Sequence, residues 1–147
     1  MRKRLSTIAL VSILGTTFAF AQNTDIIKQR KGHYEEMGKA VKEPTAMFKG
    51  EAPFDLEKVQ AALKVIQAKA AILPTLFPED SKKGGKTEAL PAIWENKADF
   101  EERFKKLAAA AKAAETSITD EASHKVQWPQ LGSNCSGCHK KYRKEKK

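Results

Sequence analysis

The sequence predicts an all-α fold, an antiparallel up-down-up-down four-helix bundle. Apolar residues recur at alternating steps of three and four along four separate segments, which is the period of a helix with one buried face. The loops between them are short to medium, which is typical of such a bundle, apart from a long one after residue 73 that contains proline and glycine. No segment alternates apolar and polar residues convincingly as a strand does. A chain of 147 residues suits a single domain with one modest core.

The first two helices are expected over residues 24–42 and 56–73. The first should end at Glu43, because the residue before Pro44 is disfavoured in α conformation. Asp55 is a suitable N-cap for the second helix, and Pro74 follows its end. The apolar seam of the first helix is interrupted by one arginine and consists of Ile27, Arg30, Tyr34, Met37 and Val41.

The third and fourth helices are expected over residues 91–116 and 119–144. Pro91 suits a first helical turn, and an alanine-rich stretch favours helix strongly after it. Thr119 or Asp120 can cap the fourth helix, while Pro129 and Gly132 are expected to kink or interrupt it. The seam of the fourth helix faces the core and consists of Trp128, Leu131, Cys135, Cys138 and Tyr142.

The first 21 residues read as a cleaved secretory signal peptide. A basic start at residues 2–4 precedes an apolar stretch over residues 8–20, and Ala19-Phe20-Ala21 forms the cleavage pattern. A membrane anchor is the alternative, but the stretch is shorter than the roughly 20 apolar residues that span a bilayer. We therefore expect an exported, periplasmic domain over residues 22–147, free of the membrane after cleavage.

The net charge of +9 is concentrated at the C-terminus. Export and the lack of a nucleic-acid-binding motif argue against a nucleic-acid partner. The basic run is either a solvated helix end, favourable against the helix dipole, or a collar that steers acidic partners. Its members are Lys140, Lys141, Arg143, Lys144, Lys146 and Lys147.

The only two cysteines of the chain lie in Cys135-Ser136-Gly137-Cys138-His139, the C-x-x-C-H pattern that attaches a c-type haem. Each thiol adds to one vinyl group of the porphyrin, which gives two thioether bonds. His139 then offers an imidazole nitrogen to the iron. Covalent attachment in bacteria takes place outside the cytoplasm on reduced thiols, so the export signal supports one covalent haem c per chain.

Three alternative roles for the cysteine pair fit the sequence less well. A structural zinc site needs four ligands, and neither His33 nor His124 has zinc-finger spacing. A redox dithiol of thioredoxin type belongs near a βαβ pattern, which is missing here. A disulfide between Cys135 and Cys138 would close a very short loop and stabilise little.

Four stretches resemble the cytochrome c prime family, the class II c-type cytochromes, and the likeness covers the whole mature chain. They are Arg30 with Tyr34, Lys49 to Asp55, Lys86 to Trp94, and Cys135 to Arg143. The resemblance implies a five-coordinate, high-spin haem iron with His139 as proximal ligand, and a non-coordinating distal side chain at Tyr34. It also implies binding of nitric oxide and carbon monoxide, single-electron transfer with an unidentified protein, and a homodimer formed mostly by the first two helices.

A related branch, the low-spin cytochromes c-556, has a methionine that ligates the iron from the first helix. Tyr34 argues against that branch, because a neutral phenol is a poor ligand for ferrous haem. Met37 lies one turn further along the seam and is the alternative ligand, although core packing is the usual role of such a methionine.

Four further side chains are candidates for contact with the haem. A lone buried guanidinium is costly, so Arg30 is expected to face a haem propionate, with a snorkelling arginine as the alternative. Thr87 and Glu88 match the family stretch beside the haem edge, and would otherwise serve only a loop and a helix cap. Arg143 follows His139 by one turn and either shapes the proximal pocket, as in the family, or lies on the surface.

The sequence contains no constellation typical of hydrolysis or group transfer, so we do not expect an enzyme. An apolar screen over an open axial position favours small neutral ligands, since a charged ligand would lose its hydration on entry.

Overall fold

The computed structural model describes residues 17–145, with side chains from Thr24 onward. Residues 1–16 of the expected signal peptide and the last two lysines lie outside this range. The first helix begins at Thr17, inside the segment expected to be removed. Across the described residues, no helix combines the length and apolar character needed to cross a membrane.

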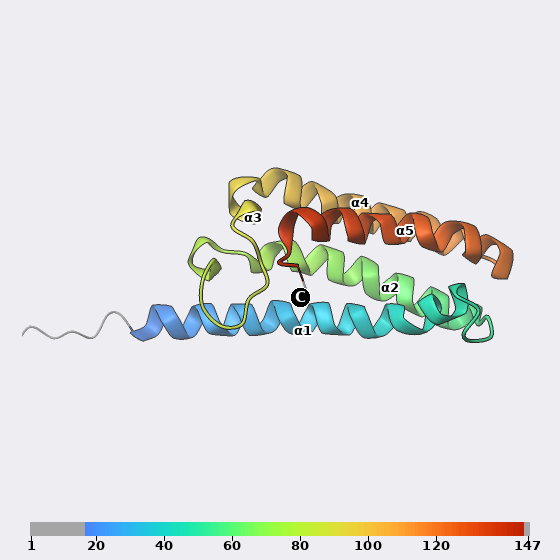
Figure 1. The fold of residues 1–147 in the computed structure, drawn as a ribbon, viewed down its shortest axis with the longest axis horizontal. Helices are drawn as coiled ribbons and strands as arrows, with labels where there is room; N and C mark the ends of the chain where they lie inside the picture. The colour runs from blue at the N-terminus through green and yellow to red at the C-terminus, as the bar shows by residue number, and fades with distance from the viewer. Residues whose placement is uncertain (1–16, 146–147) are drawn as a thin grey trace, which may run out of the picture.

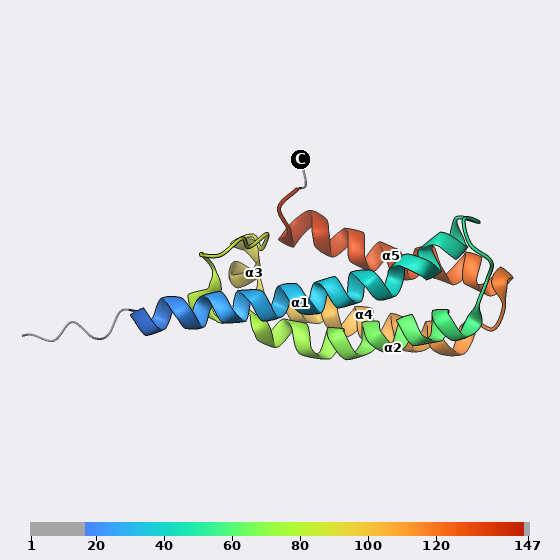
Figure 2. The same cartoon turned by 90° about the horizontal axis from the view of Figure 1, so that it is seen from below.

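Four long helices run in alternating directions and confirm the expected bundle (Figures 1 and 2). They are α1 (Thr17–Phe48), α2 (Leu56–Ile72), α4 (Lys97–Ser117) and α5 (Glu121–Tyr142). Three short elements connect α2 to α4 at one end of the bundle, namely the 3-10 turns η1 (Leu73–Leu76) and η2 (Glu79–Ser81) and the single-turn helix α3 (Ala92–Glu95). In the described part of the chain, β pairing is limited to one isolated bridge between Ala89 and Arg143.

The core lies mainly between α2 and α4, which make the most extensive contact of any two helices. The predicted seams supply it, with Val59 and Leu63 of α2 and Ala111 of α4 fully buried. Aromatic rings extend the core toward the end that carries the cysteines, with Phe100 edge-on to Phe77 at 4.8 Å between ring centroids. Such edge-to-face pairs add to the stabilisation that burial alone gives.

Both aspartates expected to cap helices do so. The carboxylate of Asp55 accepts from the backbone N–H of Lys58 at 3.1 Å. Asp120, rather than Thr119, caps α5, and its carboxylate accepts from the N–H of Ser123 at 2.7 Å while the Ser123 hydroxyl accepts from the N–H of Asp120 at 3.0 Å. This reciprocal capping box satisfies two helix-end donors, and such caps contribute about 1 kcal/mol.

The expected end of α1 at Glu43 is wrong. The helix continues through Pro44 to Phe48, and the proline ring is almost fully buried. Packing of that ring offsets the hydrogen bond that the missing N–H removes. The helix ends instead at Phe48, and the turn that follows it contains Gly50, whose φ of 78° is readily adopted only by glycine.

One other expectation about the helices is wrong, and a second, the interruption of the last helix, is wrong as well. The third helix is not continuous, because Asn96 leaves α conformation at φ −128° and ψ 46° and separates α3 from α4. By contrast, α5 is continuous through Pro129 and Gly132. Both residues are exposed, so water can satisfy the backbone carbonyl that the proline leaves unpaired.

Candidate haem site

The two cysteines lie on the inner side of α5, close to its C-terminal end. Both are free thiols, and both are half-buried and packed against the hydrophobic core. Burial raises the pKa of each thiol, and the guanidinium of Arg103 partly opposes this effect at Cys138. The two groups are therefore neutral thiols in the folded chain, unlike the thiolates of reactive or metal-binding cysteines.

The zinc alternative requires several ligand side chains close together. Among the residues that the structure describes, no three His, Cys, Asp or Glu side chains lie together in a way that could hold a metal ion. His33 lies on α1 with its Nδ1 3.1 Å from the Nζ of Lys69 on α2. His124 is fully buried nearer the start of α5, between the rings of Phe54 and Trp128.

Tyr34 of α1 lies close enough to Cys138 of α5 for the two groups to influence each other. Burial is the main cause that raises the pKa of the phenol, and the Cys138 thiol acts in the same direction. Even so, 37% of the Tyr34 surface is exposed. The hydroxyl is therefore surrounded by many atoms, while part of the side chain stays open to solvent.

Met37, the alternative distal residue, has a different environment. Its side chain is partly buried and packs against the hydrophobic core, which is the usual role of methionine at such a position. Tyr34 is not part of that core cluster. The structure thus distinguishes the two candidates, one packed into the core and one lining the α1–α5 side of the bundle.

Arg30 holds the long connection between α2 and α4 against α1. Its guanidinium donates through Nη1 to Ser81 Oγ at 2.8 Å, and through Nη2 to the Ser81 carbonyl at 3.0 Å and to Thr87 Oγ1 at 2.8 Å. The side chain is 2% exposed and lies over the Phe77 ring at 4.6 Å. Burial lowers the pKa of this guanidinium only relative to a very high ordinary value, so it stays charged.

The structure brings Thr87, Glu88 and Arg143 together beside His139. The N–H of Lys144 donates to the Glu88 carbonyl at 2.8 Å, and the N–H of Arg143 donates to the His139 carbonyl at 3.1 Å. The residues after α5 thus pair with the segment that Arg30 holds. The sequence predicted the members of this group, but not that Arg30 contacts Thr87 directly. A contact between Arg30 and a propionate stays a prediction.

Sequence reasoning missed Asp99 and Arg103 of α4. Asp99 accepts hydrogen bonds from Tyr142 and Lys141 of α5, and from Arg103 on its own helix. The four-residue spacing of Asp99 and Arg103 was the one signal in the sequence, since residues so spaced meet on a helix surface. That signal could not show that α5 completes the group.

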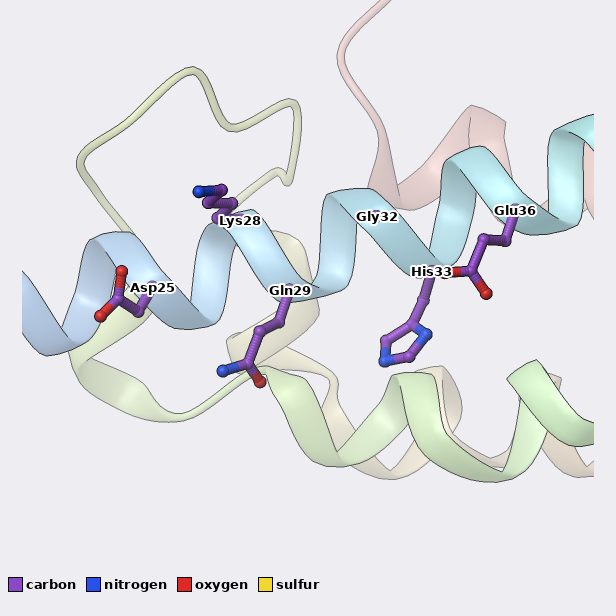
Figure 3. Close-up of a pocket in the computed structure, with 6 residues that line it drawn as sticks. All are labelled: Asp25, Lys28, Gln29, Gly32, His33 and Glu36. Atoms are coloured by element: carbon purple, nitrogen blue, oxygen red, sulfur yellow. The ribbon is translucent and has the colours of Figure 1, made fainter.

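Two surface concavities lie near this end of the bundle, and neither contains the cysteines. The larger, of about 520 Å³, is lined by polar residues of α1 from Asp25 to Glu36. In Figure 3, His33 extends from α1 toward α2, whereas Lys28 points to the opposite side. The smaller, of about 190 Å³, lies between α4 and α5 and is lined in part by Arg103 and Gly137.

The residues of the motif fit a covalently bound haem. Two free thiols lie one helical turn apart, a spacing that suits addition to two vinyl groups of one porphyrin, and both pack against apolar side chains. His139 follows at once and is half-buried. Tyr34 of α1 lies near Cys138 on this side of the bundle. This fold and this site define a c-type cytochrome built as a four-helix bundle.

Comparisons with known proteins identify the family. The profile of the family described as Cytochrome C' matches residues 25–143. A cytochrome c' of Rhodopseudomonas palustris (strain ATCC BAA-98 / CGA009) is 51% identical over 99% of both chains. A solved structure of cytochrome c' from Rhodopseudomonas palustris has a TM-score of 0.82 and 51% identity, and the match covers 84% of this chain and 99% of that one. A cytochrome c-556 of Agrobacterium fabrum (strain C58 / ATCC 33970) is 34% identical over 99% of this chain and 100% of its own. The chain belongs to the cytochrome c' family, and its cofactor is haem c.

Proposed function

We propose that this protein is a periplasmic cytochrome with a five-coordinate, high-spin haem that binds nitric oxide or carbon monoxide and carries single electrons. Cys135 and Cys138 hold the haem through thioethers, and His139 is the proximal ligand. When bound, the haem supplies a redox-active iron with one open axial position. Cleavage after Ala21 would release the domain over residues 22–147.

The position of Tyr34 is the observation that carries this proposal. Its phenol lies near Cys138 and stays neutral, because burial raises its pKa. A neutral phenol covers an iron without binding it strongly, so a small neutral gas can displace it. Charged or larger ligands are disfavoured by size and by the cost of losing their hydration.

The residues around this group have supporting roles in the proposal. Thr87, Glu88 and Arg143 surround the proximal side and the haem edge, and Arg30 holds that segment in place. The basic C-terminal residues face an unidentified redox partner protein, and two copies of the chain form a homodimer. We propose no catalytic reaction, no nucleic-acid partner and no membrane association for the mature domain.

The second candidate is a six-coordinate, low-spin electron carrier in which Met37 ligates the iron. This alternative is supported by the likeness to a protein named cytochrome c-556, which is 34% identical over nearly the whole chain. Against it, the partly buried Met37 side chain packs against the hydrophobic core. A ligating role would require it to leave those contacts.

Absorbance spectra of the purified holoprotein, with and without carbon monoxide, separate the two candidates. We expect a high-spin spectrum and binding of carbon monoxide by the reduced protein. The matched variant Met37→Leu should leave both unchanged. The six-coordinate alternative would be established by two results together. The wild type would show a sharp low-spin α band that carbon monoxide does not change, and Met37→Leu would lose that band. A protein without a Soret band would exclude both.

A further inference from the structure

One carboxylate joins α4 to the last turn of α5. Asp99 accepts the hydroxyl of Tyr142, the Nζ of Lys141 at 3.0 Å and the Nε of Arg103 at 2.9 Å, all on the same oxygen. Two of the three donors come from α5, and the third comes from the next turn of α4. The three donors hold the pKa of Asp99 well below its usual range, so the group is an anion at any physiological pH.

Tyr142 is fixed at three points and lies one turn beyond the haem motif. It is 3% exposed, and its ring stands edge-on to Phe100 at 5.2 Å between centroids. Its carbonyl accepts from the N–H of Leu90 at 3.0 Å, and its hydroxyl reaches Asp99. Because Tyr142 follows His139 by three residues, any rotation of this turn also rotates the histidine.

Arg103 extends the same cluster toward the cysteines. It lowers the pKa of the Cys138 thiol, and a Cβ atom on Gly137 would lie 3.7 Å from its Nη1. The guanidinium carbon also lies 5.7 Å from the centre of the Tyr142 ring. The Asp99 cluster, defined as Asp99, Arg103, Lys141 and Tyr142, therefore covers the α4 side of the haem-attachment turn.

We propose that Asp99 is a positioning residue for the haem site: by holding Tyr142 and Lys141 it fixes the rotation of the last turn of α5, and thus the plane of the His139 imidazole. This inference rests on the proposed role of His139 as proximal ligand. Partly exposed ion pairs contribute little to stability by themselves. Convergence of three donors beside the proximal histidine instead restricts the geometry of that turn.

The test compares two variants of the holoprotein with a control. Tyr142→Phe removes only the hydroxyl and keeps the aromatic packing, so the fold should persist. Asp99→Ala removes the carboxylate and all three hydrogen bonds that it accepts. The control is Glu115→Gln, which changes another α4 carboxylate that accepts from Gln67 at 3.1 Å and Lys112 at 3.0 Å, away from the motif. Each protein is examined by electron paramagnetic resonance of the ferric iron, by its reduction potential and by urea unfolding.

We expect both cluster variants to change the g-values of the ferric signal in the same way, because both release the turn that holds His139. Asp99→Ala should raise the reduction potential more than Tyr142→Phe, since only the former removes a negative charge. Glu115→Gln should alter the urea midpoint without changing the g-values. If both cluster variants kept wild-type g-values and only unfolded at lower urea concentrations, the Asp99 cluster would have a purely structural role and the proposal would be wrong. The wild-type spectrum separately tests the ligation on which the inference rests.

Discussion

Arg30 of α1 donates from Nη2 to the hydroxyl of Thr87 at 2.8 Å, across a sequence separation of 57 residues. Thr87 in turn accepts at its carbonyl from the Nζ of Lys144 at 3.2 Å. A continuous set of contacts therefore runs from the helix that carries Tyr34 to the residues that follow the haem motif. The long α2–α4 connection thus contacts both α1 and the residues that follow α5.

Replacement of Arg30 should loosen this connection. Arg30→Ala removes two hydrogen bonds to Ser81 and one to Thr87. Because hydrogen bonds to a charged group are typically worth about 1.5–3 kcal/mol each, we expect a loss of at least about 4.5 kcal/mol in the free energy of unfolding. Urea unfolding followed by circular dichroism measures it. Arg30→Lys keeps the charge but not the planar fork, and should give an intermediate loss.

Lys31 provides the matched control for this prediction, because it is the exposed neighbour on the same helix. Lys31→Ala should leave the free energy of unfolding within about 0.5 kcal/mol of the wild type. Equal losses in Arg30→Ala and Lys31→Ala would show that the buried contacts contribute nothing particular.

Tyr34 should control the rate at which gas reaches the iron. Tyr34→Ala removes the proposed screen over the iron, and we expect carbon monoxide to bind the reduced protein about tenfold faster, which corresponds to roughly 1.4 kcal/mol in the barrier. Flash photolysis gives the rate directly. Tyr34→Phe keeps the ring and should change the rate much less. An unchanged rate in Tyr34→Ala would place the entrance elsewhere.

Local signals in the sequence predicted the fold well. The caps at Asp55 and Asp120 depend on residues three positions away, so the sequence shows both partners side by side. The sequence could not show that α1 continues through Pro44, because that continuation depends on tertiary burial of the proline ring. The break at Asn96 could not be predicted either, because no glycine or proline lies at that position.

The candidate site shows the same division between local and distant information. The cysteine motif and His139 are contiguous, so their chemistry can be read directly. The interior position of Arg30 follows from its place in an apolar seam. Its partners Ser81 and Thr87 lie 51 and 57 residues away, and the partners of Asp99 on α5 lie 42 and 43 residues away. Spacing along one helix cannot identify contacts of that kind.

His124 should make the protein less stable in mild acid. The side chain is fully buried, and within the described structure neither ring nitrogen has a hydrogen-bond partner. Burial lowers the pKa of the imidazole below its ordinary value, partly opposed by Glu121 and reinforced by Lys125. The unfolded chain binds the proton more readily, with a pKa of about 6.5. The contribution of neutral His124 to the free energy of unfolding is therefore fully present above about pH 6.5. It falls as the pH drops through that value, and it levels off below the pKa of the folded state.

His124→Leu tests this by removing the titrating group while filling the same apolar site. The free energy of unfolding, measured by urea at a series of pH values, should decline less steeply below about pH 6.5 in the variant than in the wild type, by up to about 1.4 kcal/mol per pH unit. Parallel curves for the two proteins would mean that other groups cause the acid sensitivity.

Loss of the haem should destabilise parts of α1 and α5 more than α2 and α4. A double variant, Cys135→Ala with Cys138→Ala, cannot form the thioethers and yields the chain without cofactor. The contact between α2 and α4 does not involve the cysteines and is the most extensive in the fold, whereas α1 and α5 contact each other far less. We therefore expect hydrogen exchange to remain slow in α2 and α4, and to become fast in α1 around Tyr34 and in the last turns of α5. The single variant Ser136→Ala, which retains both thiols, should exchange like the wild type. Uniformly fast exchange in the double variant would show instead that the haem is required for the whole bundle to fold.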